Sequence, residues 1–361
     1  MYRKPLVIVC LIALIILPAV TRGVSAQEEN GGTIVEDKGI TISPVRFEYN
    51  LAPGESVTGT VKLINDTFDD KTVYLTARNF KSGDESGVPL FITEQQPFEA
   101  SLKDWISLEK GAVLVKRVET DDPHVERIEF RITVPENAEP GGHYAGIVAG
   151  LVPPGESIDA GEGNLAFKDE RAAIILINVD GEVNRDLSTD KFYATDAFTQ
   201  DKPLVSIFEW MPVGFITELR NSGNSHTVPL GHILIFSGET KIDEIDFNPA
   251  DGNILRESSR SFFNRWTGAL LELVPVLDED GNEVVDGNGN VQTRFAFNLD
   301  TPRLPFGRFT AKLAIGYDDS GEKKILVDDF EFWVIPWKLL LVIALVLIAF
   351  IYYRIKKRGR K

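Results

Sequence analysis

The C-terminal end places the strongest constraint on what this chain can fold into. The 19 residues from Ile335 to Tyr353 carry a single charge, on Lys338. A helix rises roughly 1.5 Å per residue, so this run matches the ~30 Å hydrocarbon core of a bilayer. The segment 354–361 is basic, and basic flanks stay on the cytoplasmic side. The pattern predicts a transmembrane helix at 335–353 and a cytoplasmic tail at 354–361.

Aromatic residues border this predicted span at both ends. Amphipathic rings settle at the boundary between lipid and water. The predicted membrane-interface residues are Trp333, Trp337, Tyr352 and Tyr353.

The N-terminus has the pattern of a secretory signal peptide. Arg3 and Lys4 precede an apolar run, and small residues end at Ala26. This order predicts a signal peptide at 1–26 that is cleaved between Ala26 and Gln27. With the C-terminal span, it predicts a single-pass type I protein of the cell membrane with an extracytoplasmic ectodomain. Cleavage would remove Cys10, the only cysteine, so no disulfide or thiolate metal site is expected.

The charge of the predicted ectodomain excludes one class of partner. All 54 acidic residues but only 28 of the 38 basic ones lie between the signal and the span, giving a net charge of −26 there. Such a surface repels nucleic acid and favours neutral or cationic partners, although it also serves solubility alone.

Short alternating strands fill the chain after a polar tether at 27–39. Val45, Phe47 and Tyr49 alternate with polar residues, and 127–134 places Ile128 and Phe130 on one face. A continuous apolar run at 172–179 predicts a central strand. Short strands separated by turn residues are typical of a β-sandwich, here predicted over 40–182.

A second unit, predicted over 183–334, repeats this pattern of short strands separated by turns. The segment 307–314 echoes 142–149: each has a glycine, a basic residue, an aromatic and then small and apolar residues. We therefore predict an all-β fold of two tandem immunoglobulin-like β-sandwiches, followed by one C-terminal transmembrane helix.

No motif for catalysis, a cofactor or a resident metal is present in the sequence. The histidines have no ligand spacing, and we interpret His226 and His232 as surface or hairpin residues. The acidic segments 278–282 and 286–290 lack the glycine and glutamate positions of a calcium loop, and we interpret them as hairpin turns, with weak calcium binding left open. We expect no enzymatic activity.

One aromatic cluster stands out as a candidate partner patch. Phe262, Phe263 and Trp266 follow a polar run and could form a short helix or an apolar loop surface. Trp105 and Tyr144 lie in alternating strands and are predicted to be core residues.

Several short motifs follow one another in the order of a known family. They are Ser43-Pro44-Val45, the Pro53-Gly54-Glu55 turn, the Asn65 turn, Trp105-Ile106 and the strand 142–150. In this order the chain resembles the WxL-interacting proteins of Gram-positive surfaces. The resemblance implies a peptidoglycan-binding immunoglobulin-like domain, a second such domain that binds a protein partner, and a C-terminal membrane anchor.

The predicted function is therefore binding of cell-wall glycan (peptidoglycan), of another surface protein, or of both. The alternative is a membrane-tethered chaperone or assembly factor for exported proteins, which donates or accepts a β-strand. That alternative predicts an unpaired apolar edge strand. The oligomeric state stays open.

Overall fold

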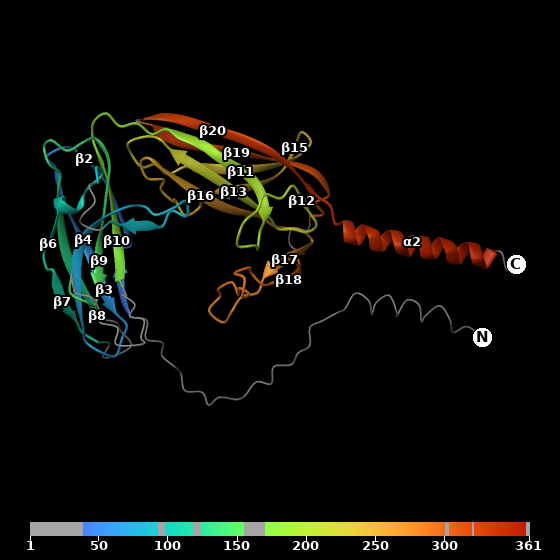
Figure 1. Ribbon diagram of the computed structural model, residues 1–361, viewed down its shortest axis with the longest axis horizontal. Helices are drawn as coiled ribbons and strands as arrows, with labels where there is room; N and C mark the ends of the chain where they lie inside the picture. Colours follow the sequence, from blue (N-terminus) through green and yellow to red (C-terminus); the bar gives the residue numbers. More distant parts are fainter. Residues whose placement is uncertain are drawn as a thin grey trace. The chain divides into compact units, whose positions relative to one another are not determined.

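Strands dominate the described part of the chain, and they form two β-sandwiches (Figure 1). The computed structural model describes residues 39–92, 98–117, 124–154, 170–299, 303–319 and 321–358. The predicted all-β architecture with immunoglobulin-like sandwiches is confirmed. The predicted signal peptide, with its cleavage site at Ala26 and Gln27, lies outside the described residues.

The first sandwich has one sheet in the order β1–β3–β8–β6 and another along the path β2–β10–β9–β4–β5, with β7 beside β4. A short 3₁₀ helix, η1, precedes β6. The bounds are β1 Ile40–Ser43, β2 Arg46–Leu51, β3 Ser56–Asn65, β4 Lys71–Ser82, β5 Pro89–Phe91, η1 Lys103–Trp105, β6 Ile106–Leu108, β7 Ala112–Val115, β8 His124–Thr133, β9 Gly141–Gly150 and β10 Glu170–Val179.

The second sandwich has sheets in the orders β11–β13–β16 and β12–β20–β19–β14–β15, and a small β17–β18 sheet is attached to it. The bounds are β11 Leu187–Asp196, β12 Ile207–Phe208, β13 Val213–Asn221, β14 Leu230–Ser237, β15 Thr240–Phe247, β16 Ser258–Trp266, β17 Leu271–Pro275, β18 Thr293–Phe297, β19 Gly307–Asp319 and β20 Glu322–Val334.

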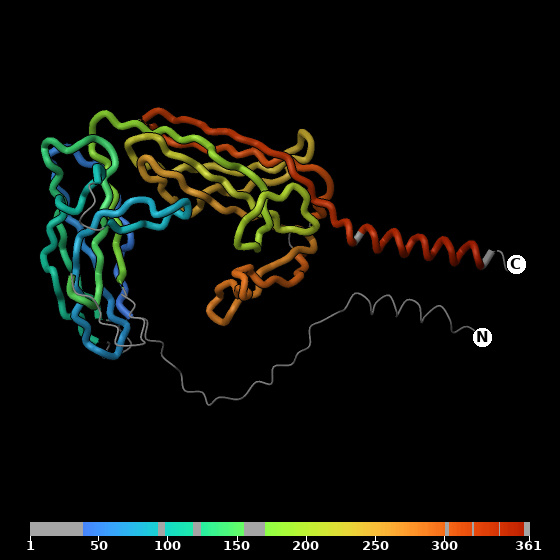
Figure 2. The backbone as a smooth tube through the Cα atoms, viewed as in Figure 1, coloured from blue at the N-terminus to red at the C-terminus, as the bar shows by residue number. Residues whose placement is uncertain are grey.

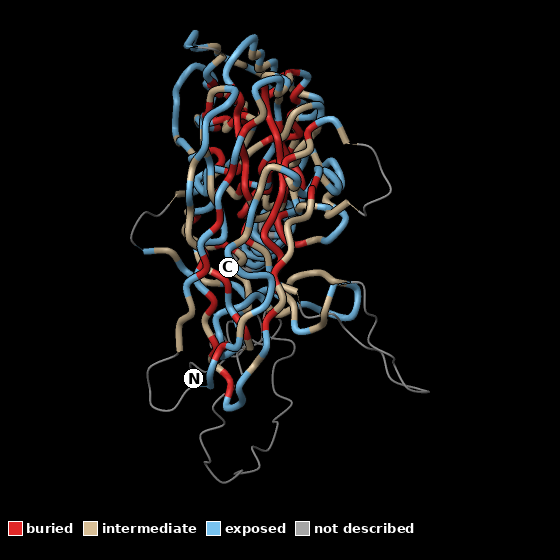
Figure 3. The backbone as a smooth tube through the Cα atoms, turned by 90° about the vertical axis from the view of Figure 1, so that its left-hand side faces the viewer, coloured by how far each residue is buried: buried red, intermediate tan, exposed pale blue. Residues whose placement is uncertain are grey.

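Period-two alternation builds the core of each sandwich. In β8, Ile128, Phe130 and Ile132 are buried, whereas Glu129 and Arg131 between them are exposed. Successive side chains of a strand point to opposite faces, so one face packs inward. Each sandwich has its own cluster of buried apolar residues, and Figure 3 shows buried segments running along the strands.

A glycine in β3 makes room for one of these core rings. Gly59 lies directly opposite Phe130 of β8. A Cβ atom at this position would come within 2.7 Å of the Phe130 Cε1 atom. The absence of a side chain at Gly59 therefore lets the phenyl ring lie over the backbone of the neighbouring strand.

The two sandwiches share a topology, in agreement with the sequence echo. The strands that carry the echoed segments, β9 and β19, each lie beside the last strand of their sandwich. The last strands, β10 and β20, each have a parallel neighbour on the other side, β2 and β12. This correspondence allows one sandwich to serve as a reference for the other.

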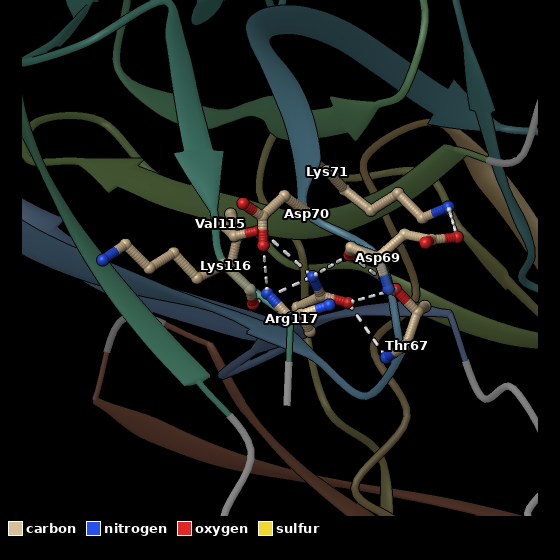
Figure 4. Close-up of polar contacts among 8 residues, drawn as sticks. Thr67, Asp69, Asp70, Lys71, Val115, Lys116 and Arg117 are labelled. Atoms are coloured by element: carbon tan, nitrogen blue, oxygen red, sulfur yellow. Dashed lines mark hydrogen bonds and ion pairs between the residues drawn. The ribbon is translucent and has the colours of Figure 1, made fainter. Parts of the chain in front are cut away.

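A buried asparagine closes the end of β3. The Asn65 side chain is fully buried, and its Nδ2 atom lies 3.0 Å from the carbonyl oxygens of Asp69, Val115 and Lys116. Its Oδ1 atom accepts hydrogen bonds from the N–H and the hydroxyl of Thr67 (Figure 4). The turn predicted here is confirmed, and the Asn65 side chain is hydrogen-bonded inside it.

Asn221, at the end of β13, repeats this arrangement in the second sandwich. It is also fully buried, and its Nδ2 atom donates to the carbonyl oxygens of Ser225, Ile254 and Leu255. Each sandwich thus ties a turn to a distant strand or loop through one asparagine side chain.

The C-terminal segment forms a helix, α2, at Trp337–Arg358. Across the described part of the chain, however, no helix is both long enough and apolar enough to cross a membrane. This finding contradicts the predicted single-pass localisation and the transmembrane part of the fold prediction.

Candidate functional site

The last strand of the second sandwich, β20, has an open edge. β19 pairs with β20 along its whole length, from Glu322 to Val334. On the other side, β12 pairs with only Trp333 and Val334. No other described strand pairs with β20, so residues 322–332 form a sheet edge without a hydrogen-bonded partner strand. Figure 2 traces β19 and β20 as one long hairpin in orange and red.

The corresponding strand of the first sandwich is covered. There β2 pairs in parallel with β10 over six residue pairs, from Arg46–Ile174 to Leu51–Val179. The same position in the second sandwich holds β12, which is two residues long. The open edge therefore results from the shortness of the covering strand, and the topology itself is unchanged.

The polar backbone groups of this edge have a definite direction. The Trp333 N–H donates to the Ser206 carbonyl across the outer edge, at 2.8 Å. Strand geometry alternates, and the β19–β20 register has no shift, so the odd-numbered residues 323–331 also direct their N–H and C=O groups outward. These groups form a ladder that another strand can complete.

Two large apolar side chains are exposed at the middle of the edge. Ile325 is 76% exposed and Val327 is 71% exposed. Leu326 and Phe330, which point to the opposite face, pack against the core. The exposed side of β20 thus presents branched apolar side chains directly beside the outward backbone groups, as the strand-accepting alternative predicted.

Charges flank these apolar residues on both sides. Lys323 and Lys324 precede them, and Asp328 and Asp329 follow them. A hydrogen bond from Lys324 to Asp319, at 2.6 Å, raises the pKa of the lysine. Charged side chains at a sheet edge discourage indiscriminate pairing and can select a partner of complementary charge.

Other edge strands lack this combination of length and apolar exposure. β15 exposes one large apolar side chain, Ile242, which is 38% exposed. β18 exposes Phe295 and Phe297 but spans only 5 residues. In β11, the register shifts between Thr189 and Lys191, and such a bulge interrupts a regular ladder. We therefore take the β20 edge as the candidate site.

The aromatic patch predicted at 262–266 is not a surface cluster. These residues belong to β16, in place of the expected short helix or loop. Phe262 and Trp266 are buried, and the Trp266 Nε1–H donates to Asp243 at 2.6 Å. Phe263 is 38% exposed, with the Lys202 ammonium 4.4 Å from its ring centre. Strand alternation sends Phe262 and Trp266 inward and leaves only Phe263 at the surface.

The four predicted membrane-interface residues are exposed side chains in or near α2. Trp333 lies on β20 beside the open edge, and Trp337 begins the helix. Tyr352 and Tyr353 lie in its last turns and are 64% and 51% exposed. The structure therefore places Trp333 at the candidate site, next to the short strand β12.

The remaining candidate groups are structural. Burial and the neighbouring Arg185 guanidinium lower the pKa of His226 to about 4, and this residue is partly exposed, whereas His232 is exposed at the surface. Asp278 and Asp286 each accept backbone N–H bonds within their own turns, as the hairpin prediction expected. The described residues contain no cluster of three or more possible metal ligands.

Comparison with known proteins finds distant structural likenesses only. No family model matches the chain, and no curated protein is significantly similar to it. The fimbrial chaperone CfaA covers 80% of this chain and 99% of its own, at 12% identity and a TM-score of 0.34. The Escherichia coli chaperone DraB covers 81% and 96%, at 12% identity and a TM-score of 0.31. The Acinetobacter baumannii chaperone–tip complex CsuC–CsuE covers 80% and 97%, at 11% identity and a TM-score of 0.31.

These neighbours are chaperones, and this finding contradicts the predicted cell-wall-binding function. The membership in the WxL-interacting family stays a prediction. At these identities and TM-scores, the likeness to the chaperones is one of fold alone.

Proposed function

We propose that this chain is a non-enzymatic assembly factor that binds an extended segment of a partner protein by adding it as a strand along β20. The observation that carries the proposal is the open edge at residues 322–332, with Ile325 and Val327 exposed beside the outward backbone groups. An added strand would complete this ladder and cover the two apolar side chains.

The physical gain comes from two sources. The outward N–H and C=O groups of the odd-numbered residues would gain partners, each contributing about 0.5–1.5 kcal/mol net. Covering Ile325 and Val327 would remove apolar surface from water, at about 25 cal/mol per Å². Both gains are partly offset by the ordering of the bound segment, so binding should require several adjacent residues.

The charges at the edge define the chemistry of the bound segment. Asp329 and Glu331 both have exposed side chains on the face that carries Ile325 and Val327. A matching segment would place branched apolar residues beside Ile325 and Val327 and basic residues beside the two acids. Opposite charges on directly facing strand positions contribute roughly 0.2–1 kcal/mol per pair.

The test uses the full-length chain and a synthetic peptide of alternating valine and threonine with two lysines at one end. The reversed peptide tests the other strand direction. We expect saturable binding of one of the two peptides in a fluorescence anisotropy titration. The substitution Val327→Pro removes one outward N–H without removing an inner hydrogen bond, and it should weaken binding by at least ~10-fold.

Val327→Thr is the matched control, because threonine keeps both the backbone N–H and a strong strand preference. It should weaken binding only a few-fold, by about 1 kcal/mol or less. Equal affinity of the parent and the Val327→Pro variant, with circular dichroism showing both folded, would refute strand addition at this edge.

A further inference from the structure

The open edge of β20 has a sequence that is complementary to itself. Residues 323–329 read Lys-Lys-Ile-Leu-Val-Asp-Asp, with two cations before the apolar centre and two anions after it. Leu326 lies at the midpoint. Reversing the direction of this strand exchanges its positive end for its negative end.

Two such edges match when they run antiparallel about an axis through Leu326. In this register, Ile325 lies opposite Val327 of the second copy. Lys323 lies opposite Asp329 of the second copy, and Lys324 lies opposite Asp328 of the second copy. The two-fold symmetry repeats each pair, so every charge in the segment faces an opposite charge and the apolar residues face one another.

The backbone directions agree with this register. Directly opposite residues of an antiparallel pair must both point toward the partner or both point away from it. Lys323, Ile325, Val327 and Asp329 all direct their backbone groups outward, and the register pairs them only with one another. A shift by one residue would set outward groups against inward ones and would also separate the charges.

We propose that a second copy of this chain occupies the β20 edge when no partner segment is bound. Pairing about Leu326 would join the two five-stranded sheets into one continuous sheet. The inference rests on the proposed function in one respect: the dimer is a resting form that protects the edge, and a bound segment competes with it.

The charge complementarity is what selects a second copy as the occupant. Within the described residues, no ion pair involves Lys323, Asp328 or Asp329, so these charges are available to a partner. The net charge of the chain, −16, opposes association of two copies at long range. Attraction must therefore come from the local pattern, which makes a charge-exchange experiment decisive.

The experiment compares the full-length parent with two variants by sedimentation velocity. One variant carries Lys323→Glu and Lys324→Glu, and the other carries Asp328→Lys and Asp329→Lys. We expect the parent to dimerise and each variant alone to be monomeric, with dimer affinity reduced roughly 100-fold, because four attractive pairs become repulsive. An equimolar mixture of the two variants should dimerise again, since each supplies the charges that the other lacks.

The control is Lys62→Glu with Lys110→Glu at exposed positions of the first sandwich, which lowers the net charge by the same amount as Lys323→Glu with Lys324→Glu. It should dimerise like the parent. A monomeric parent at its highest soluble concentration, a charge variant that stays dimeric, or a mixture that stays monomeric would each overturn the proposal.

Failure of this proposal and failure of the proposed function give different results. A parent that is monomeric but binds the valine–threonine peptide contradicts the dimer and leaves strand addition intact. A parent that forms the charge-dependent dimer but binds neither peptide supports self-pairing and contradicts partner binding. Where both hold, the peptide should dissociate the dimer as its concentration rises.

Discussion

Replacing Asn65 by alanine should specifically destabilise the first sandwich. The side chain is fully buried, and its Nδ2 atom has two hydrogens for three carbonyl oxygens, each 3.0 Å away. Its Oδ1 atom accepts two further bonds from Thr67, at 3.0 and 2.7 Å. The variant leaves these buried groups without partners, which is more costly than the loss of the same bonds at a surface.

The expected loss is about 2–4 kcal/mol, because roughly four hydrogen bonds contribute about 0.5–1.5 kcal/mol each and are not fully additive. For a domain of this size, that corresponds to a fall of roughly 5–15 °C in Tm. Scanning calorimetry of the full-length chain measures it. The transition of the first sandwich should shift, and Asn221→Ala should shift that of the second sandwich instead.

Two further variants of the first sandwich test the hydrogen-bond geometry around the Asn65 side chain. Asn65→Asp keeps the size of the side chain but turns an oxygen toward the three carbonyls, so it should destabilise more than alanine. Asn50→Ala removes an exposed asparagine of β2 and should change stability by less than about 0.5 kcal/mol. If Asn65→Ala shifts the transition no more than Asn50→Ala does, the buried hydrogen bonds of Asn65 do not stabilise the first sandwich as argued.

The remaining predictions concern His226 and Gly59. The folded state keeps His226 neutral down to about pH 4, whereas its ordinary pKa is 6.5, so stability should fall by up to about 3 kcal/mol between pH 6.5 and pH 4. Urea unfolding of His226→Gln should show a shallower fall over this range, and parallel curves for variant and parent would contradict this origin. Gly59→Ala should cost about 2 kcal/mol by displacing the Phe130 ring, and Phe130→Leu should recover part of that loss. Strict additivity in the double variant would argue against the contact.

Alternation in the sequence predicted much of the fold. The pattern at Ile128, Phe130 and Ile132 indicated a strand with one buried face, and the structure confirms it. The echo between 142–149 and 307–314 indicated related units, and β9 and β19 occupy corresponding places. Local patterns of this kind succeed because a half-buried strand must alternate wherever it lies in a sandwich.

The same rule also applies at 262–266. Phe262, Asn264 and Trp266 alternate with Phe263 and Arg265, and the first three are buried. The polar residues just before this segment favoured a loop, and the alternation could have identified β16. Nothing in the sequence of residues 322–334 shows which neighbouring strand β20 lacks.

The sequence by itself determined which residues alternate, where turns interrupt them, and that residues 323–329 carry opposite charges around an apolar centre. Only the tertiary structure decided that Asn65 reaches Val115 and Lys116, because those carbonyls lie about 50 positions along the chain. It alone also decided that β12 covers two residues of β20 while β2 covers six of β10. Pairing between strands depends on which backbone groups meet after folding. The side-chain pattern of a single strand does not specify which strand lies beside it.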